Sequence, residues 1–220
     1  MKRKNVYAIP HKGLRNALSQ LSLLAGKTDY SIPNEIVQLY NFALDVWRLI
    51  DIHADDENAV TLAKLDGRCK YCSVHDLTDH LELHVIQEKL QDMLGNLCVD
   101  SSSGDMDWTE RGAEFYLSFT EFQSRYLEHI AQEERITQPL LWKYFTDEEL
   151  MAQHREIMER NPPELLLIWF KFVIPAQSPV ERLELIRGFR QMASPAFFDA
   201  GKKVIRQHLP KREYDALFGS

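Results

Sequence analysis

Residues 115–145 have the apolar spacing of a helix that faces a protein core. Apolar or aromatic side chains recur there every three or four residues, at Phe115, Phe119, Phe122, Tyr126, Ile136 and Leu140. His129 and Glu133 interrupt this stripe near its middle, one helical turn apart. Because a buried polar group costs free energy unless another group satisfies it, this pair constrains what the helix packs against.

A second H-x-x-x-E pair lies in another predicted helix, which begins near Ser31 and Pro33. The apolar stripe of this helix is interrupted by His53 and, four residues later, by Glu57. Side chains at positions i and i+4 of a helix lie within about 6 Å of each other, so each pair can serve one site. The recurrence on two helices predicts that both pairs belong to the same site.

The whole pattern predicts an all-α protein, because no strand-like alternation of useful length occurs. Four long helices are expected before residue 146, and short connections between them predict an up-down-up-down four-helix bundle over residues 1–146. Pro10 is expected to open the first helix, and residues 65–73 and 99–107 read as loops.

Residues 147–220 are predicted to form a C-terminal extension of four shorter helices packed on the bundle. Thr146 begins a capping box, T-D-E-E. Ser178 and Ser194 are each followed by proline, the combination of an N-cap with proline at the first helical position.

The amino-acid composition and the charge limit the partners and the location that we expect for the protein. The formal charge of −7 lies wholly in residues 1–146, which hold 15 Lys+Arg and 22 Asp+Glu, whereas residues 147–220 hold 11 of each. No basic stripe is present, so nucleic acid is not an expected partner. No secretory signal or membrane span is expected either, and three cysteines favour a reducing compartment. We therefore expect a soluble, cytoplasmic protein with no membrane partner.

Cys69 and Cys72 form a single C-x-x-C. A structural zinc site needs a second pair of ligands, and neither another C-x-x-C nor an H-x-x-x-H at finger spacing flanks it. We interpret the two cysteines as surface thiols in a loop rather than as a metal or redox site.

Each predicted long helix turns at least one polar residue of the kind that binds metals toward the common core. The candidates are His11 on the first helix, His53 and Glu57 on the second, His75 or His80 on the third, and His129 and Glu133 on the fourth. A single core histidine is usually hydrogen-bonded to a carbonyl group, but a set on four helices favours metal binding. Two divalent ions would satisfy the imidazoles and both carboxylates together.

A ferritin-like di-iron site can be tested directly, because it uses E-x-x-H on two helices. None of the residues three positions before the eight histidines is acidic. The ferritin-like alternative therefore fails.

At these residues the chain resembles the hemerythrin-like family, also called the HHE cation-binding domain. The motifs are P-H-K-G-L-R (residues 10–15), H-A-D-D-E (residues 53–57), D-H (residues 79–80) and H-I-A-Q-E-E-R-I-T-Q-P-L-L (residues 129–141). The Y-F-T-D-E-E-L that follows is similar to the same junction in an iron-sensing member found in an F-box ubiquitin ligase subunit. The resemblance covers roughly residues 8–150.

The resemblance implies a non-haem di-iron centre that binds or senses O2, iron, NO or peroxide. It implies His11, His53, Glu57, His129 and Glu133 as iron ligands, with manganese or zinc as possible substitutes.

The third helix departs from the pattern of oxygen-carrying hemerythrins, which place H-x-x-x-H there. The chain has this spacing at His80 and His84, but the helical phase turns His84 away from the core and pairs His80 with Asp76. His75 falls where the F-box protein has its third-helix histidine. We rank His80 first, His75 second and His84 third.

The fourth helix departs too, because those carriers place an aspartate five residues after the histidine and Glu134 stands there. Glu133 lies about 40° from His129 around the helix and Glu134 about 140°, so Glu133 is the expected ligand.

These departures weaken the case for a reversible O2 carrier. A binding or sensing protein is the leading hypothesis, with O2 or another small diatomic or peroxide as its ligand. The alternatives are a di-iron oxidase or peroxidase acting on O2 or H2O2, and an iron-dependent interaction module that presents the C-terminal helices to a protein partner.

Overall fold

The structure is a computed structural model that describes residues 3–100 and 107–219. Every regular element in these residues is helical, which confirms the prediction of an all-α protein. Within the described part, none of the helices combines the length and the apolar character that crossing a membrane requires.

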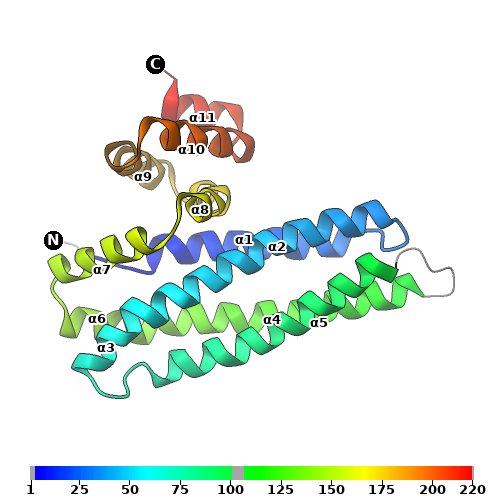
Figure 1. Cartoon of the computed structure of the whole chain (residues 1–220), viewed down its shortest axis with the longest axis horizontal. Helices are drawn as coiled ribbons and strands as arrows, with labels where there is room; N and C mark the ends of the chain where they lie inside the picture. Colours follow the sequence, from blue (N-terminus) through cyan, green and yellow to red (C-terminus); the bar gives the residue numbers. More distant parts are fainter. Residues whose placement is uncertain (1–2, 101–106, 220) are drawn as a thin grey trace.

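The longest helices lie side by side along the molecule (Figure 1): α1 (Ala8–Lys27), α2 (Pro33–Asp56), α4 (Val74–Asp100) and α5 (Trp108–Gln132). Helices α1 and α4 each pack against both α2 and α5. One apolar cluster fills the space between them, and each helix contributes fully buried side chains such as Leu14, Leu39, Leu94 and Phe119.

Two of these helices continue past their α-helical part through a π-helical segment. Helix α2 runs into η1 (Glu57–Leu62) and then α3 (Ala63–Arg68), and α5 runs into η2 (Glu133–Thr137) and then α6 (Gln138–Tyr144). Helical structure through Arg68 corrects the prediction that a loop begins at residue 65. The buried side chain of Leu65 accounts for the longer helix, because it packs in a second apolar cluster with Tyr7 and Leu141.

The first helix begins at Ala8, two residues before the expected Pro10. Asn5 explains the earlier start, because its Oδ1 accepts hydrogen bonds from the backbone N–H groups of Tyr7 and Ala8. These N–H groups would otherwise lack partners at the start of the helix.

The C-terminal helices are α7 (Asp147–Arg160), α8 (Pro163–Ala176), α9 (Pro179–Met192), α10 (Pro195–His208) and α11 (Lys211–Phe218). Helix α7 begins with the capping box predicted at Thr146, and α9 begins with a second capping box at Ser178. The Ser194 side chain caps α10. The short helix α11, which follows Pro210, was not expected from the sequence.

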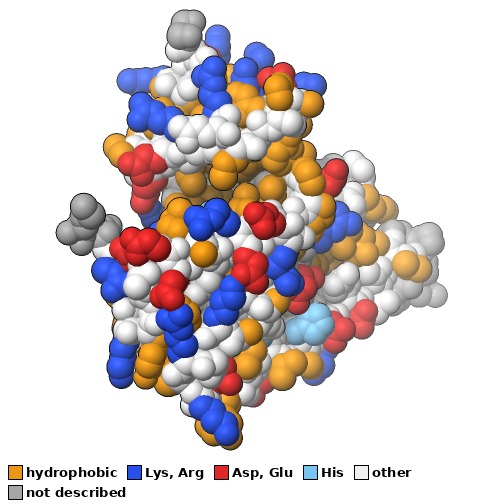
Figure 2. Space-filling model, turned by 60° about the vertical axis from the view of Figure 1, so that its left-hand side comes forward, with side chains coloured by type: hydrophobic (Ala, Val, Ile, Leu, Met, Phe, Trp, Pro, Cys, Tyr) orange, Lys and Arg blue, Asp and Glu red, His pale blue; other side chains and the backbone are white. Residues whose placement is uncertain are grey.

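Helix α8 joins the C-terminal helices to the long ones, because it packs on α1 while α10 packs on α8. The contact is close at Gly13, where an added Cβ would lie 2.4 Å from Cγ2 of Val173. The Asn16 side chain donates to the carbonyl of Phe172 in α8, and Lys12 of α1 also pairs with Glu181 of α9. Figure 2 shows hydrophobic side chains gathered in the hollow below the C-terminal helices, with charges of both signs over the lower surface.

Two loop predictions have different outcomes. In the predicted loop at residues 99–107, Val99 and Asp100 belong to α4, and residues 101–106 lie outside the described residues. Cys69 and Cys72 are joined by a disulfide in the turn between α3 and α4, which corrects the prediction of two surface thiols. Both cysteines are partly buried against the cluster around Tyr7 and Leu65.

Candidate metal centre

Six polar side chains from the long helices meet in the interior. The histidines come one from each helix, and the two glutamates are the first residues of the π segments: His11, His53, His80, His129, Glu57 and Glu133. None is more than 7% exposed, although each carries a polar or ionisable group. The two H-x-x-x-E pairs and one histidine from each of the other two helices therefore lie together in one buried region.

The first group of ligand-type atoms surrounds His11 and His53. Nε2 of His11 lies 3.3 Å from Oε2 of Glu133, and Nε2 of His53 lies 3.3 Å from Oε1 of Glu57. One ligand atom from each of these four side chains lies within 4.8 Å of all the others.

The second group comprises His80, His129 and Glu133, and the second oxygen of Glu57 contacts His80 alone. Nε2 of His129 lies 3.4 Å from Oε1 of Glu133, and Nε2 of His80 lies 3.4 Å from Oε2 of Glu57. Nε2 of His80 also lies 3.7 Å from Oε1 of Glu133. Each carboxylate thus faces one histidine pair with one oxygen and the other pair with the second oxygen.

These separations match those between ligands of a common ion. Two atoms each about 2.1 Å from one metal ion lie about 3.0–3.4 Å apart at octahedral or tetrahedral angles. The contacts are longer than ordinary hydrogen bonds between nitrogen and oxygen. The spacing therefore suits atoms that share a metal ion better than atoms that are directly hydrogen-bonded.

The polar atoms that face the centre have no hydrogen-bond partner among the described residues. They are Nε2 of all four histidines, Oε2 of Glu57 and both oxygens of Glu133. A cluster of unpartnered buried polar atoms of this size is rare in proteins. Imidazole nitrogens and carboxylate oxygens suit iron, manganese and zinc, so the donor set fits a pair of such ions.

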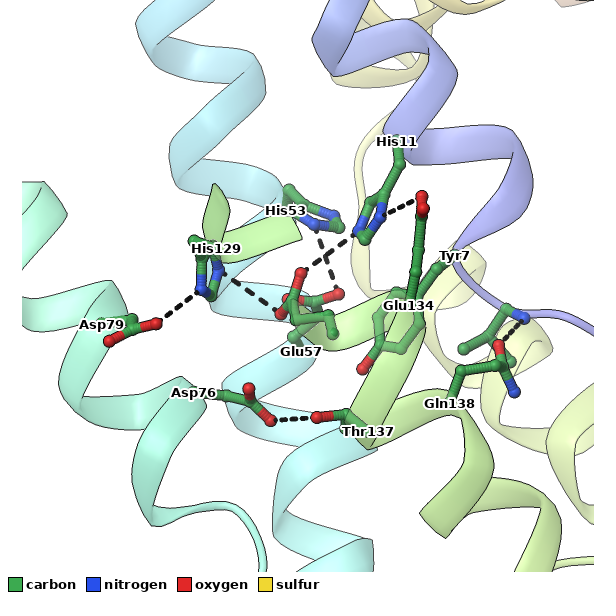
Figure 3. A network of polar contacts seen from close by, with 12 residues as sticks. Tyr7, His11, His53, Glu57, Asp76, Asp79, His129, Glu134, Thr137 and Gln138 are labelled. Atoms are coloured by element: carbon green, nitrogen blue, oxygen red, sulfur yellow. Dashed lines mark hydrogen bonds and ion pairs between the residues drawn. The ribbon is translucent and has the colours of Figure 1, made fainter. Parts of the chain in front are cut away.

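The outward-facing nitrogens of three histidines are, by contrast, held by side chains around the centre, and Figure 3 shows those of His11 and His129. Nδ1 of His11 lies 3.0 Å from Glu134, and Nδ1 of His129 lies 3.2 Å from Asp79. Nδ1 of His80 lies 2.7 Å from Oδ1 of Asn58. Such contacts fix the ring orientation and the tautomer of a metal-binding histidine, leaving Nε2 for the metal.

Burial and mutual charge shift the pKa values of the histidines in opposite directions. Burial lowers the pKa of His11 and His80, but contact with glutamates outweighs it and raises their pKa values to about 9 and about 10. Burial lowers the pKa of His53 well below its ordinary value, with the charge of His11 adding to the effect. Burial also lowers the pKa of His129.

The pKa values of the two glutamates also shift in opposite directions. Burial and the charge of Glu133 raise the pKa of Glu57 to about 8, whereas contacts with His11 and His80 hold the pKa of Glu133 well below its ordinary value despite burial. The metal-free site therefore keeps protons on some ligands and not on others, and metal binding must displace them.

Two other histidines considered on the third helix lie outside both groups. The His75 side chain is 52% exposed, its Nε2 contacts Gln132, and its Nδ1 lies 3.5 Å from Asp79. The His84 side chain is 56% exposed and lies near Asp51 and Glu88. The structure therefore places His75 apart from both groups, and His80 is the α4 histidine that lies in one of them.

Glu134 also lies outside the centre and plays a supporting part. It pairs with Arg15 at 2.7 Å and with Nδ1 of His11, and both contacts lower its pKa to about 2 although partial burial opposes them. The choice of Glu133 over Glu134 as the inward-facing residue agrees with this arrangement.

Three other side chains lie around the centre without belonging to either group. Asp76 is buried, and its Oδ2 accepts a hydrogen bond from Thr137 at 2.7 Å. Tyr7 stacks on His11 with ring centroids 4.8 Å apart. Trp169 of α8 lies against His53, with ring centroids 6.2 Å apart. The helical phase had already paired Asp76 with His80, whereas no feature of the sequence around Trp169 indicates a contact with the centre.

Comparisons with known proteins give distant matches. No protein-family model matches the chain, and no solved structure matches it significantly. The chain is 23% identical over 158 residues to F-box/LRR-repeat protein 5 of Salmo salar and 25% identical over 160 residues to the protein of that name from Danio rerio. The matches cover 71% and 70% of this chain but only 22% of each relative.

Proposed function

We propose that this chain is a hemerythrin-like protein that holds two iron ions and binds or senses O2 or a related small oxidant or NO. In this proposal α1, α2, α4 and α5 form an up-down-up-down four-helix bundle, and residues 147–220 are an extension packed on it. The order and spacing of the H-x-x-x-E motifs support the family, and the distant similarity to F-box/LRR-repeat proteins is compatible with it.

The division of carboxylate oxygens carries the proposal. Glu57 and Glu133 each face both histidine pairs, at separations of 3.3–3.4 Å from the nearest Nε2 atoms. His11 and His53 would hold one ion, His80 and His129 the other, and the two glutamates would bridge them. The ion pair would supply redox-active or Lewis-acidic centres for a small ligand.

The surrounding side chains would keep the centre dry and oriented. Asn58, Asp79 and Glu134 hold the outer nitrogens of three histidines. Trp169 and the apolar cluster between the long helices exclude water from the other sides. Low water content favours binding of a small neutral ligand over hydrolytic chemistry.

Metal analysis with an optical spectrum tests the proposal. Protein prepared in air is expected to contain about two iron ions per chain and to absorb in the near-ultraviolet through ligand-to-iron charge transfer. Reversible bleaching on removal of O2 would favour O2 binding, whereas repeated consumption of peroxide would favour the oxidase or peroxidase. Protein that folds normally and binds neither iron, manganese nor zinc would disprove the proposal.

A second candidate, the iron-dependent interaction module, is favoured by one contact. Helix α8 reaches the centre through Trp169 and packs on α1 at Gly13, two residues from His11. Metal binding would thereby stabilise the packing of α8 on α1. It would also fix the position in which the C-terminal helices are presented to a protein partner. Iron-dependent protection of α8 amides from hydrogen exchange would support this function, and protection unaffected by iron would argue against it.

A further inference from the structure

The Tyr7 hydroxyl group is a buried polar group that the metal ligands do not explain. Tyr7 is 1% exposed, and its hydroxyl group has no hydrogen-bond partner in the described part of the chain. Leaving such a group unpaired costs free energy, because its hydrogen bond with water is lost and not replaced. The ring alone would pack as well as phenylalanine, so the hydroxyl group requires another explanation.

The position of Tyr7 directs the hydroxyl group toward the centre. The ring stacks on His11 at an interplanar angle of 22°. In Figure 3 the hydroxyl end of Tyr7 points toward the side of the centre where Asp76 and Thr137 lie.

No acceptor of the described protein pairs with the Tyr7 hydroxyl group, although Asp76 lies on this side. The Thr137 hydroxyl donates to Asp76. The oxygens of Glu57 and Glu133 would be taken by the metal pair under the proposed function. A phenol at neutral pH is a hydrogen-bond donor, so a ligand that brings an acceptor into the site would satisfy Tyr7.

We propose that Tyr7 is a positioning residue that donates a hydrogen bond to a small oxygen- or nitrogen-containing ligand bound beside the metal pair. This inference rests on the proposed function, because it requires the metal pair to be present. Full burial of Tyr7 limits the ligand to a few atoms. Ligands that accept a hydrogen bond are held more tightly than ligands of similar size that accept none.

Azide, a small anion that accepts hydrogen bonds, is a suitable probe for the iron-loaded full-length chain. In the Tyr7→Phe variant, azide affinity measured by optical titration is expected to fall about ten-fold, which corresponds to ~1.4 kcal/mol, about one hydrogen bond. Iron content and helix content are expected to stay at wild-type values. Resonance Raman spectra give a direct readout, because a hydrogen-bonded azide mode shifts in D2O in the wild type and not in Tyr7→Phe.

Tyr126→Phe is the matched control. Tyr126 is also buried and lies against a candidate ligand, with ring centroids 5.9 Å from His129, but its hydroxyl group is not among the unpartnered buried atoms. Its azide affinity should stay within two-fold of wild type.

Three other outcomes would overturn the inference, and the measurements distinguish them from one another. Iron-loaded Tyr7→Phe with unchanged azide affinity and an unchanged D2O shift would show that the hydroxyl group donates to no ligand. Loss of iron in Tyr7→Phe alone would show that Tyr7 supports the metal ligands instead. Absence of metal from the wild type would disprove the proposed function itself, and the inference with it.

Discussion

Glu57 and Glu133 occupy equivalent places on two different helices. Each is the first residue of a π-helical segment, each follows a histidine by four residues, and each presents one carboxylate oxygen to each histidine pair. π-helical segments are rare and occur frequently at functional sites. One such segment begins at each of the two proposed bridging residues. This coincidence indicates that the local backbone geometry orients the two carboxylates.

Replacement of Glu133 tests the bridging role against that of its neighbour. Glu133→Gln is expected to reduce metal content from about two ions per chain to one or fewer, because an amide cannot bridge two cations as a carboxylate does. Glu134→Gln is the matched control: it keeps both ions with about 10–100-fold weaker affinity, the usual effect of losing a group that orients a ligand. Metal analysis after chelator competition measures both. Equal loss in the two variants would contradict the assignment.

The third long helix offers a second matched pair. His80→Ala is expected to remove the ion held by His80 and His129, because it leaves that ion with a single imidazole. His75→Ala is expected to keep full metal content, since the His75 side chain is exposed and contacts Gln132. Titration with ferrous iron under anaerobic conditions distinguishes them. Loss of metal in His75→Ala with none in His80→Ala would reverse the assignment.

Helical periodicity was sufficient to find most of the centre from the sequence. His53 with Glu57 and His129 with Glu133 were recognised because polar residues interrupted apolar stripes. The choice of Glu133 over Glu134 followed from an angle of 100° per residue and agrees with the inward position of Glu133, which is fully buried.

The remaining features depend on tertiary packing, which periodicity does not report. The sequence did not exclude His75 as an inward-facing residue beside His80. The direction in which a side chain points depends on where the helix begins, and α4 begins only at Val74. The π segments shift the register after Glu57 and Glu133 without a sequence signature. Contacts of Asn58 and Asp79 with histidines of other helices require the final packing angles. The disulfide was missed because one C-x-x-C is equally compatible with free thiols.

Metal-free protein should lose stability as the pH rises from neutral. The folded-state pKa values of His11 and His80 are raised to about 9 and about 10, above the ordinary value near 6.5. Their contribution to stability is therefore fully present below about pH 6.5 and is lost as the pH rises through their folded-state values. Glu57, with a pKa raised to about 8, acts in the same direction.

Metal affinity should change in the opposite sense, because metal ions compete with these protons. Affinity is expected to rise up to roughly ten-fold per pH unit for each displaced proton between pH 6 and 9. Urea unfolding of metal-free protein and chelator competition over that range measure the two trends. Flat profiles in both experiments would show that His11 and His80 are not protonated in the metal-free fold.

The close packing of α8 on α1 can be tested at Gly13. Gly13→Ala is expected to lower the free energy of unfolding by about 1–3 kcal/mol, because the new Cβ would lie 2.4 Å from Cγ2 of Val173 and the helices must separate. Gly188→Ala in α9 is the matched control, since nothing lies within 4 Å of its added Cβ. That variant should be stabilised by about 0.5–1 kcal/mol through helix propensity. Chemical denaturation measures both, and metal affinity measured alongside shows whether moving α8 also disturbs His11, two residues from Gly13. Equal effects in the two variants would mean that α8 does not depend on close contact with α1.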